Sequence, residues 1–354
     1  MTRTTLGLAI TLTVLGLGAC SETMAPTKPG TARSRSPAIS SLALSSNSWT
    51  ATAPMPEERW RFAAAASVLT TTAGQSVVYV LGGRYSQSPM DPPASTILSY
   101  DVTTNTWTTK AARFMGAGTN GIGKIGSKLY ISGGWDFTGD FSQWIDASSS
   151  LFAYDLVRDR VTRKANMPRG TAYGITGVIN SKLYVLAGKC FQASCNSFYR
   201  YDPATNAWTT LAPAPNSHIG GAGVVIAGKF YVAGGGLRPF RSFDVYDPLT
   251  NTWTTLAPMP PRRELAVGTT LQGKFYVIGF EPGGDRNTVA YDPVTKTWRN
   301  RAPFPEAEPG QTISHPSAAL RVKLDGRSHI LTVGSGLLLA EGGAYPAPSQ
   351  MYTP

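Results

Sequence analysis

The sequence predicts an all-β protein, a six-bladed β-propeller in which each blade is a sheet of four antiparallel strands. Three observations predict this fold. A short apolar run that ends near glycine recurs six times, and a Tyr-Asp pair followed by tryptophan recurs behind it at a nearly fixed distance. In addition, a strand-like segment near the start of the chain lacks the Tyr-Asp pair that the repeat requires.

The apolar runs are the strongest repeat in the chain. Successive copies lie 51, 54, 47, 45 and 55 residues apart. They occupy residues 79–83, 130–134, 184–188, 231–235, 276–280 and 331–335. A period of this length is typical of propellers and other repeat folds. We expect each run to be the second strand of a blade, ending where glycine permits a positive φ angle and a close approach of neighbouring backbone.

A Tyr-Asp pair follows each of the first five runs and marks the third strand. The pairs are residues 100–101, 154–155, 201–202, 246–247 and 291–292. Seven residues after each tyrosine stand Trp107, Val161, Trp208, Trp253 and Trp298, respectively. The residues between them are rich in Asp, Pro, Thr and Asn, which favour tight turns. The pattern therefore predicts a third strand, a turn and a fourth, outermost strand, with the first strand lining the axis.

The two ends of the chain predict how the ring closes. The sixth unit stops two residues after Tyr352, so its outer strand is missing from the C-terminus. Trp49 stands in a context that matches Trp253, but no Tyr-Asp pair precedes it. We expect the segment around Trp49 to supply the outer strand of the last blade, which removes two exposed sheet edges. The propeller is therefore expected to span residues 47–354.

The glycine doublet, the Tyr-Asp pair and the tryptophan at these separations resemble the kelch repeat. The resemblance covers the chain from about Trp49 to its end, and it implies the propeller fold while saying little about function. The chain departs from the pattern at Val161 in place of Trp, at Ala187, Phe280 and Ser335 in place of Gly, and throughout the sixth unit. We expect the repeated tyrosines and tryptophans to pack blades together.

The first residues resemble the leader of a bacterial lipoprotein. Residues 1–19 combine Arg3 with a short apolar run, as a signal peptide does. The run ends in Leu17-Gly18-Ala19-Cys20, which resembles a lipobox, so Cys20 is the expected lipidation site. Because Ser21 follows, the resemblance implies an outer-membrane lipoprotein, facing the periplasm or the cell surface. The alternative is an ordinary secretory signal with a chance cysteine.

Two further features concern the exported chain. Residues 20–46 are rich in Ser, Thr, Pro and Ala and predict a flexible tether behind the lipidated cysteine. Cys190 and Cys195 form a close leftover pair, for which a disulfide is the default in an oxidising compartment. A metal site is the rival, but two thiols without nearby histidine do not make one. We therefore expect a disulfide that closes one loop, and no metal.

The net charge of +11 includes Arg3, so the exported chain carries close to +10. Such a charge attracts polyanions, although it is also common in proteins without an anionic partner. No basic run or recognition helix is visible, so we expect no nucleic acid partner. A lipid anchor is the expected contact with the membrane, and the chain is expected to be a monomer.

Function in a propeller is expected on one face, which we call the loop face. It carries the connections from second to third strands and those from a fourth strand to the next blade. The candidate ligand-binding residues there are Arg59, Arg61, Arg113, Trp135, Trp144, Arg169, Tyr173, His218, Arg263 and Glu264. Arginine can bind carboxylates, and aromatic rings can stack on sugars or peptide side chains. Arginine at the start of a kelch repeat is also typical of a residue that only ties blades together.

These features predict a non-catalytic recognition module of the cell envelope for a protein or an acidic glycan. The alternative is a sugar epimerase or mutarotase that resembles the six-bladed periplasmic kelch proteins that epimerise sialic acid. Acid–base chemistry would then fall to Glu264 or His218, but the sequence does not place them within reach of each other. Serine-triad, phosphate-loop and HExxH signatures are absent from the sequence, so no catalytic residue and no cofactor is assigned.

Overall fold

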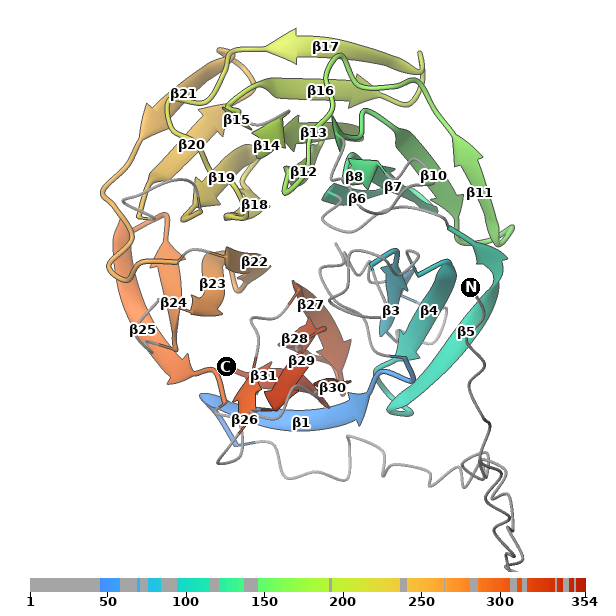
Figure 1. Cartoon of the computed structure of the whole chain (residues 1–354). Coiled ribbons are helices and arrows are strands. Elements are labelled where there is room, and N and C mark those ends of the chain that lie inside the picture. The colour runs from blue at the N-terminus through green and yellow to red at the C-terminus, as the bar shows by residue number, and fades with distance from the viewer. Residues whose placement is uncertain are drawn as a thin grey trace, which may run out of the picture. The chain divides into compact units, whose positions relative to one another are not determined.

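The computed structural model shows six four-stranded antiparallel sheets arranged around an axis (Figure 1). It describes residues 45–57, 69–70, 76–83, 94–114, 121–136, 146–190, 193–235, 241–263, 265–280, 286–305, 311–313, 317–334, 336–339, 344–346 and 348–354. This architecture confirms the predicted six-bladed propeller. Among the described residues, no helix has both the length and the apolar character needed to cross a membrane.

The blades follow one another along the chain, and each is given from its innermost to its outermost strand. Blade I contains β2 (Leu69–Thr70), β3 (Ser76–Leu81), β4 (Thr96–Asp101) and β5 (Thr106–Arg113). Blade II contains β6 (Gly121–Ile125), β7 (Lys128–Ser132), β10 (Leu151–Asp155) and β11 (Arg160–Arg163). Blade III contains β12 (Ile175–Ile179), β13 (Lys182–Leu186), β16 (Phe198–Asp202) and β17 (Ala207–Leu211).

The second half of the ring repeats this order. Blade IV contains β18 (Ala222–Ile226), β19 (Lys229–Ala233), β20 (Phe243–Asp247) and β21 (Thr252–Thr255). Blade V contains β22 (Leu265–Leu271), β23 (Lys274–Phe280), β24 (Asn287–Asp292) and β25 (Thr297–Pro303). Blade VI contains β27 (Ala318–Leu324), β28 (Arg327–Val333), β31 (Pro348–Thr353) and β1 (Ser48–Pro54).

The last blade is closed by the first strand of the propeller, as expected. β1 pairs antiparallel with β31, with Ser48 opposite Thr353 and Trp49 opposite Tyr352. The N-terminal strand is thus the outer strand of blade VI, and pairing it covers an edge of β31 that could otherwise recruit another chain.

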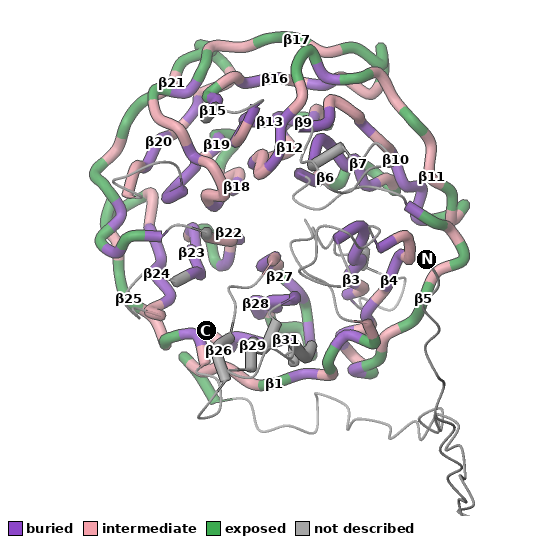
Figure 2. The backbone as a smooth tube through the Cα atoms, viewed as in Figure 1, coloured by how far each residue is buried: buried purple, intermediate pink, exposed green. Residues whose placement is uncertain are grey.

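The core lies between neighbouring blades, where the second and third strands are the most buried and the outer strands the least (Figure 2). Between blades III and IV, the rings of Phe198 and Phe230 stack with centroids 5.8 Å apart. Tyr184 and Tyr246 belong to the same apolar cluster. Complete burial of one such side chain contributes about 1.5–3 kcal/mol, so these layers account for much of the adhesion between blades.

A second link between blades is polar and recurs around the ring. In blade III, the Tyr201 hydroxyl donates to Asn206 Oδ1 at 2.7 Å, and the same oxygen accepts the N–H of Ala165 behind blade II at 3.1 Å. The Trp208 indole N–H donates to the Ala165 carbonyl at 2.8 Å. We call this arrangement the blade clamp, and it confirms that the repeated tyrosines and tryptophans join blades.

The blade clamp recurs elsewhere with equivalent residues. Its Tyr, Asn and Trp are Tyr100, Asn105 and Trp107 in blade I, Tyr246, Asn251 and Trp253 in blade IV, and Tyr352, Asn47 and Trp49 in blade VI. In blade II, where Val161 stands in place of Trp, Asp159 takes the place of Asn and accepts the Tyr154 hydroxyl at 2.6 Å. Its other oxygen accepts the N–H groups of Ala111 and Ala112.

Three small sheets within the connections were not expected from the sequence. They are β8 (Trp135–Asp136) with β9 (Asp146–Ala147), β14 (Lys189–Cys190) with β15 (Ala193–Ser194), and β26 (Gln311–Ile313) with β29 (Gly336–Leu339) and β30 (Ala344–Pro346). These segments are too short to show a periodicity of apolar residues. They nevertheless give the connections of the loop face short, regular sheets.

Candidate functional site

Hydrogen bonds join the connections that were expected to share the loop face. The connection between blades II and III contacts both blades there. On one side, the Thr171 carbonyl accepts the N–H of Gly134, at the end of β7, at 2.8 Å. On the other side, Ala172 and Lys189 exchange two backbone hydrogen bonds of 2.9 and 2.8 Å. The two sets of connections therefore meet on one face.

Three residues at the same repeat position are buried and fasten these connections. Thr171 Oγ1 accepts the N–H of Gly188 at 2.9 Å. His218 Nδ1 lies 2.8 Å from the Gly234 carbonyl oxygen, and Arg263 Nη2 donates to the Asn287 carbonyl. Two of the candidate ligand-binding residues, His218 and Arg263, thus lie inside the protein and support the loop face from below.

His218 belongs to a buried polar network around Asp244. The carboxylate of Asp244 accepts from His218 Nε2 at 2.8 Å, from Thr255 Oγ1 at 2.7 Å and from Asn216 Nδ2 at 3.0 Å. Burial by itself would raise the pKa of Asp244, but these hydrogen bonds outweigh it and lower the pKa below the ordinary value. Both ring nitrogens of His218 thus contact oxygen atoms inside the protein, one on the Gly234 carbonyl and one on the Asp244 carboxylate.

Arg263 is fully buried between blades IV and V. Its Nη1 donates to the Arg262 carbonyl at 2.9 Å, and its own carbonyl accepts the N–H of Gly235 at 2.9 Å. Its contact with Asn287 reaches the first residue of β24 in blade V. A side chain used in this way ties blade V to the end of β19, which is the structural role that the sequence left open for these arginines.

Tyr173 stands at the opening of the innermost strand of blade III and has an unusual backbone. Its φ angle is +54°, in the left-handed region, and its side chain is half-buried. At the same position before blade IV stands Gly220, with a φ of +65°. The Tyr173 carbonyl accepts the N–H of Gly220 at 3.4 Å, and the Gly220 carbonyl accepts that of Ala266 at 2.9 Å. This bend is therefore part of a row of two backbone hydrogen bonds that links blades III, IV and V.

Basic side chains also lie in the connections of the loop face. Arg169 is exposed four residues before it, and half-buried Lys189 pairs with its neighbour Ala172. Arg262 is exposed in the connection between blades IV and V. Lys189 was missed in the sequence because its place beside Ala172 follows from the β14 hairpin, for which no sequence signal exists.

The remaining candidate residues lie away from this group or outside the described part. Arg113 is exposed at the end of outer strand β5, where its Nη1 donates to the carbonyls of Lys110, Ala111 and Ala112. For Trp135 the structure describes the backbone, in β8, but not the side chain. Cys20, Arg59, Arg61, Trp144 and Glu264 lie outside the described residues.

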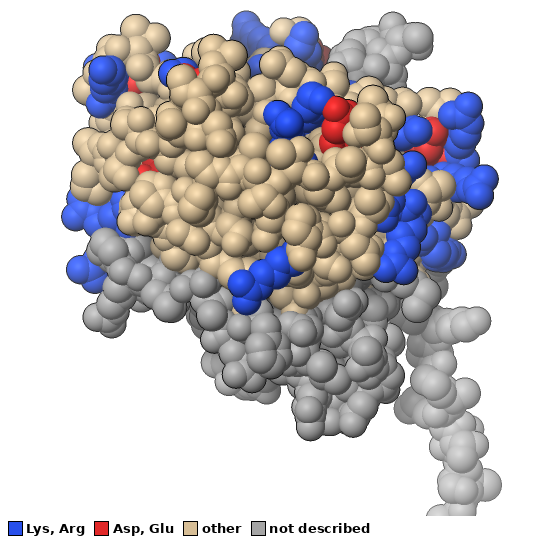
Figure 3. All heavy atoms as spheres, turned by 90° about the horizontal axis from the view of Figure 1, so that it is seen from above, with Lys and Arg blue, Asp and Glu red and all other residues tan. Residues whose placement is uncertain are grey.

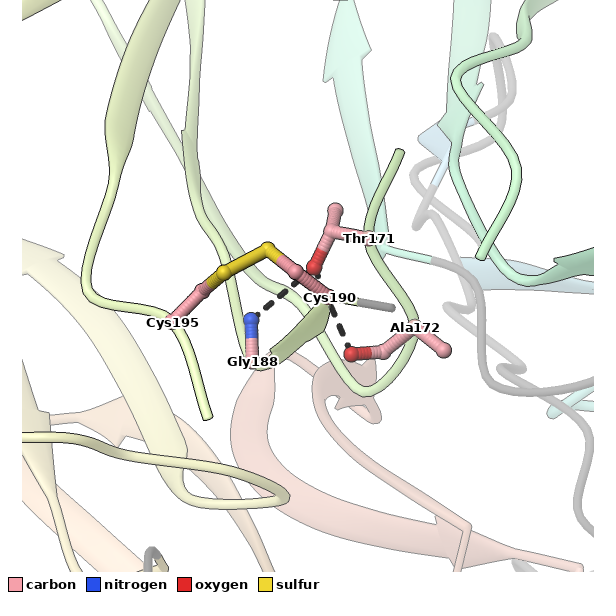
Figure 4. The surroundings of a disulfide bond; sticks show 5 residues. All are labelled: Thr171, Ala172, Gly188, Cys190 and Cys195. Atoms are coloured by element: carbon pink, nitrogen blue, oxygen red, sulfur yellow. Dashed lines mark hydrogen bonds between the residues drawn. A yellow bond between two sulfur atoms is a disulfide. The ribbon is translucent and has the colours of Figure 1, made fainter. Parts of the chain in front are cut away.

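The expected disulfide is present beside this group. Cys190 and Cys195 are bonded, with Cα atoms 5.7 Å apart, and both are buried. Figure 4 shows the bond next to the hydrogen bond between Thr171 and Gly188. The bond thus closes the β14–β15 hairpin against the connection that carries Tyr173. Within the described residues, no three His, Cys, Asp or Glu side chains group in a way that could hold a metal ion.

Comparison with known proteins gives kelch motifs in the middle of the chain. A family model described as the kelch motif matches residues 176–215 and 220–260, in blades III and IV. Kelch-like protein 25 of Xenopus tropicalis is 26% identical over 166 residues, which cover 46% of this chain and 27% of that protein. Kelch-like protein terF of Aspergillus terreus is 27% identical over 170 residues, or 45% of this chain and 36% of that protein.

A third relative extends the same comparison. Beta-scruin of Limulus polyphemus is 24% identical over 160 residues, which cover 45% of this chain and 18% of that protein. The chain thus spans well under half the length of these relatives. Among solved structures, that of YjhT superimposes with a TM-score of 0.59 at 16% identity, covering 83% of this chain and 95% of the other. Likeness at this level of identity establishes a common fold and nothing about a common ligand.

Proposed function

We propose that this chain, a kelch-repeat β-propeller, is a non-catalytic recognition module of the cell envelope that binds a protein or glycan partner through its loop face. The observation that carries the proposal is the left-handed backbone of Tyr173. A bulky residue with a positive φ angle is an outlier, and strain of this kind gathers at binding sites.

The ring itself provides a reference for the strain at Tyr173. The next connection makes the same bend with Gly220, which pays no steric penalty at positive φ. A residue with a Cβ atom costs about 1–2 kcal/mol in that conformation. The fold therefore accepts glycine here, and the tyrosine reduces its stability. A role in binding supplies the compensating reason for an aromatic ring at this position.

The surroundings of Tyr173 indicate the kind of partner. Arg169, Lys189 and Arg262 are cationic and lie on the same face. An aromatic ring beside arginine and lysine side chains suits a sugar or peptide that carries carboxylate or sulfate groups. The disulfide between Cys190 and Cys195 holds the hairpin next to Tyr173, which reduces the ordering cost of binding.

The envelope location in this proposal rests on the sequence around Cys20. Lipidation of Cys20, with residues 20–46 as a tether, would hold the propeller at the outer membrane while leaving the loop face free to bind. Replacement of Cys20 by alanine should move the protein from the membrane fraction to the soluble periplasmic fraction. An unchanged distribution of the Cys20→Ala protein would reject the anchor and leave the binding proposal intact.

The alternative of a sugar epimerase finds little support in the described residues. Both ring nitrogens of His218 contact acceptors within the protein, so neither is left to exchange a proton with a sugar. The other candidate, Glu264, lies outside the described residues. An NMR assay of anomerisation with acidic sugars separates the two functions, because a recognition module should leave the uncatalysed rate unchanged.

The replacement Tyr173→Gly tests the binding proposal directly. The variant keeps the bend that Gly220 makes in the next connection, so its unfolding midpoint should be equal to or above that of the wild type. Binding to glycan and peptide arrays should weaken by about 1–2 kcal/mol, the scale of a lost aromatic contact with its buried area. Arg169→Ala should weaken binding to charged array members without altering stability.

A matched control replaces an exposed arginine on an outer strand, outside the loop face. Arg299→Ala removes one exposed cation from β25, far along the ring, and should leave array binding unchanged. If Tyr173→Gly binds every array member as well as the wild type does, the loop face around Tyr173 is not the recognition surface.

A further inference from the structure

Six cationic side chains gather on the outer edge of blades I and II, and we call them the basic rim. They are Lys110, Arg113, Arg158, Arg160, Arg163 and Lys164. The four arginines are exposed and the two lysines are half-buried. The end of β5 lies beside the start of β11, where Asp159 accepts the N–H groups of Ala111 and Ala112 at 3.1 and 3.4 Å. The cations of β5 and those around β11 therefore lie on neighbouring stretches of the rim.

Two carboxylates lie within the basic rim, and both already have partners. Asp155 forms an ion pair with Arg158 at 3.1 Å and accepts backbone N–H groups from its turn. Asp159 is occupied by the blade clamp, through the Tyr154 hydroxyl and two backbone N–H groups. The cations exceed these carboxylates, so the surface keeps a local positive excess that can attract a ligand of opposite charge.

The propeller repeat shows that the fold does not need these cations. Blade III has threonine, alanine, threonine and leucine at the positions of Arg158, Arg160, Arg163 and Lys164: Thr205, Ala207, Thr210 and Leu211. Blade IV likewise has Thr250, Thr252, Thr255 and Leu256. Both blades form the same four-stranded sheet and the same blade clamp. The four charges of blade II are therefore additions to a frame that folds without them.

Protection of an exposed sheet edge is the other reason for cations on an outer strand. The outer strands β17, β21 and β1 contain no lysine or arginine. Figure 3 looks onto the β17 side of the ring, where much of the central surface is uncharged and the Lys and Arg side chains lie mainly toward its edges. Three outer strands of the ring thus form exposed edges without any lysine or arginine. Protection of an edge therefore does not account for the basic rim.

We propose that the basic rim binds a linear polyanionic glycan, a chain of sugar units that carry carboxylate or sulfate groups. Arg160 and Arg163 are three residues apart on β11, about 10 Å along an extended strand, and their side chains leave opposite faces of it. Lys110 and Arg113 continue the positive surface across β5. Exposed cations on both sides of the outermost strands can contact several charges of one polymer that runs along the rim, which a single small anion does not offer.

The side chains also favour a glycan over a nucleic acid. Single-stranded nucleic acids are held by aromatic rings that stack on the bases, and the six rim residues include no ring. At the position where β17 and β21 have tryptophan, β11 has Val161. The proposed contact is thus electrostatic, on a surface separate from Tyr173, and it does not rest on the recognition function proposed for the loop face.

The test replaces two rim arginines by the residue that other blades use. Arg160→Thr/Arg163→Thr introduces residues found at these positions in blades IV and III, so the unfolding midpoint should stay unchanged. Affinity is measured by calorimetry for dextran sulfate and polygalacturonate at two salt concentrations. We expect binding by the full chain to weaken about tenfold in the variant, the scale of two exposed charge contacts, and to weaken with added salt in the wild type.

The control removes the same charge elsewhere. Arg299→Thr/Arg301→Leu, on β25 of blade V, should alter the affinity less than twofold. Equal losses in both variants would overturn the proposal in favour of net charge alone. Tighter binding to single-stranded DNA or to phosphatidylserine vesicles than to either glycan would also overturn it, as would binding abolished by Tyr173→Gly. The last outcome would assign the glycan to the loop face instead.

Discussion

Tyr352 and Asn47, 305 residues apart in the chain, make the same hydrogen bond as Tyr201 and Asn206, which are five residues apart. In both pairs the hydroxyl donates to the amide oxygen, at 2.9 and 2.7 Å respectively. The two ends of the propeller thus rebuild across the closure a contact that blades I, III and IV make within one turn. Closure is therefore specific in its side chains as well as in its strand pairing.

The first prediction concerns this closure contact. Asn47→Gly removes the amide but keeps a residue that tolerates the φ angle of +51° found there. The hydroxyl of Tyr352 and the N–H of Ala302 then lose their acceptor. We expect the free energy of unfolding to fall by about 1–3 kcal/mol, the cost of unsatisfied polar groups. Asn206→Gly, measured alongside by chemical denaturation, should cost a similar amount.

Truncation extends this test from one side chain to the whole strand. Removal of residues 1–44 leaves Asn47 and β1 in place and should leave the unfolding transition unchanged. Removal of residues 1–54 takes away β1 and exposes the edge of β31, so aggregation or a loss of cooperative unfolding should follow. A protein that starts at residue 55 and keeps its full stability would show that the N-terminal strand does not close the ring.

The second prediction is a stabilising change in blade V, where the blade clamp is incomplete. Lys296 stands at the Asn position with a φ angle of +56°, and among the described residues the buried indole N–H of Trp298 has no hydrogen-bond partner. Lys296→Asn supplies the amide that blades I, III, IV and VI use and suits the left-handed backbone better. We expect the free energy of unfolding to rise by about 0.5–1.5 kcal/mol.

A control for this change separates the clamp from the backbone effect. Lys296→Gly relieves the same backbone conformation but offers no amide oxygen, so it should stabilise less than Lys296→Asn. The comparison is made by measuring the thermal unfolding midpoints of the two variants. Equal midpoints would mean that the amide adds nothing in blade V.

The sequence predicts the fold well because each repeat carries the same strand and turn signals. The Tyr-Asp pair and the tryptophan recur in successive blades, so a single departure such as Val161 does not obscure the number of blades. The unmatched Trp49 and the early end after Tyr352 then predict the closure strand. Each of these signals is local, and local signals survive in a single sequence.

The loop face was harder to predict, because its residues act through contacts between blades. His218 and Arg263 are polar residues in connections, a pattern that also favours ligand binding, yet both are buried against backbone of a neighbouring connection or blade. The burial of these two side chains depends on how β19 and β24 pack beside them. The sequence of one repeat does not show this packing. Tyr173 shows the converse, since its positive φ angle becomes visible only beside Gly220.

The third prediction concerns acid stability and the network around Asp244. The pKa of Asp244 is lower in the folded protein than its ordinary value of 3.8, so its contribution to stability is present above that value. The contribution is lost as the pH falls below 3.8 and through the lower folded pKa. Asp244→Asn should cost about 1–3 kcal/mol at neutral pH, because it weakens the hydrogen bonds that the buried carboxylate accepts from His218, Thr255 and Asn216.

The pH dependence provides the control for this prediction. The pKa values of Asp155, Asp159, Asp202, Asp247 and Asp292 are also lowered, so both proteins lose stability in acid. The difference between wild type and Asp244→Asn isolates Asp244, and it should shrink as the pH is lowered through 3.8 toward 2. A difference that stays constant across this range would show that the carboxylate charge does not matter to the network.

The last prediction links the disulfide to the backbone under Tyr173. Replacing both Cys190 and Cys195 by alanine opens a short loop, and the expected loss is about 2 kcal/mol in the free energy of unfolding. The loss should be felt locally, because Cys190 follows Lys189, whose backbone exchanges hydrogen bonds with Ala172. Hydrogen exchange of the Lys189 and Ala172 amides should accelerate, whereas that of Gly221, which donates to the His218 carbonyl, should not. If all three amides accelerate together, the disulfide stabilises the whole propeller and does not act specifically on this part of the loop face.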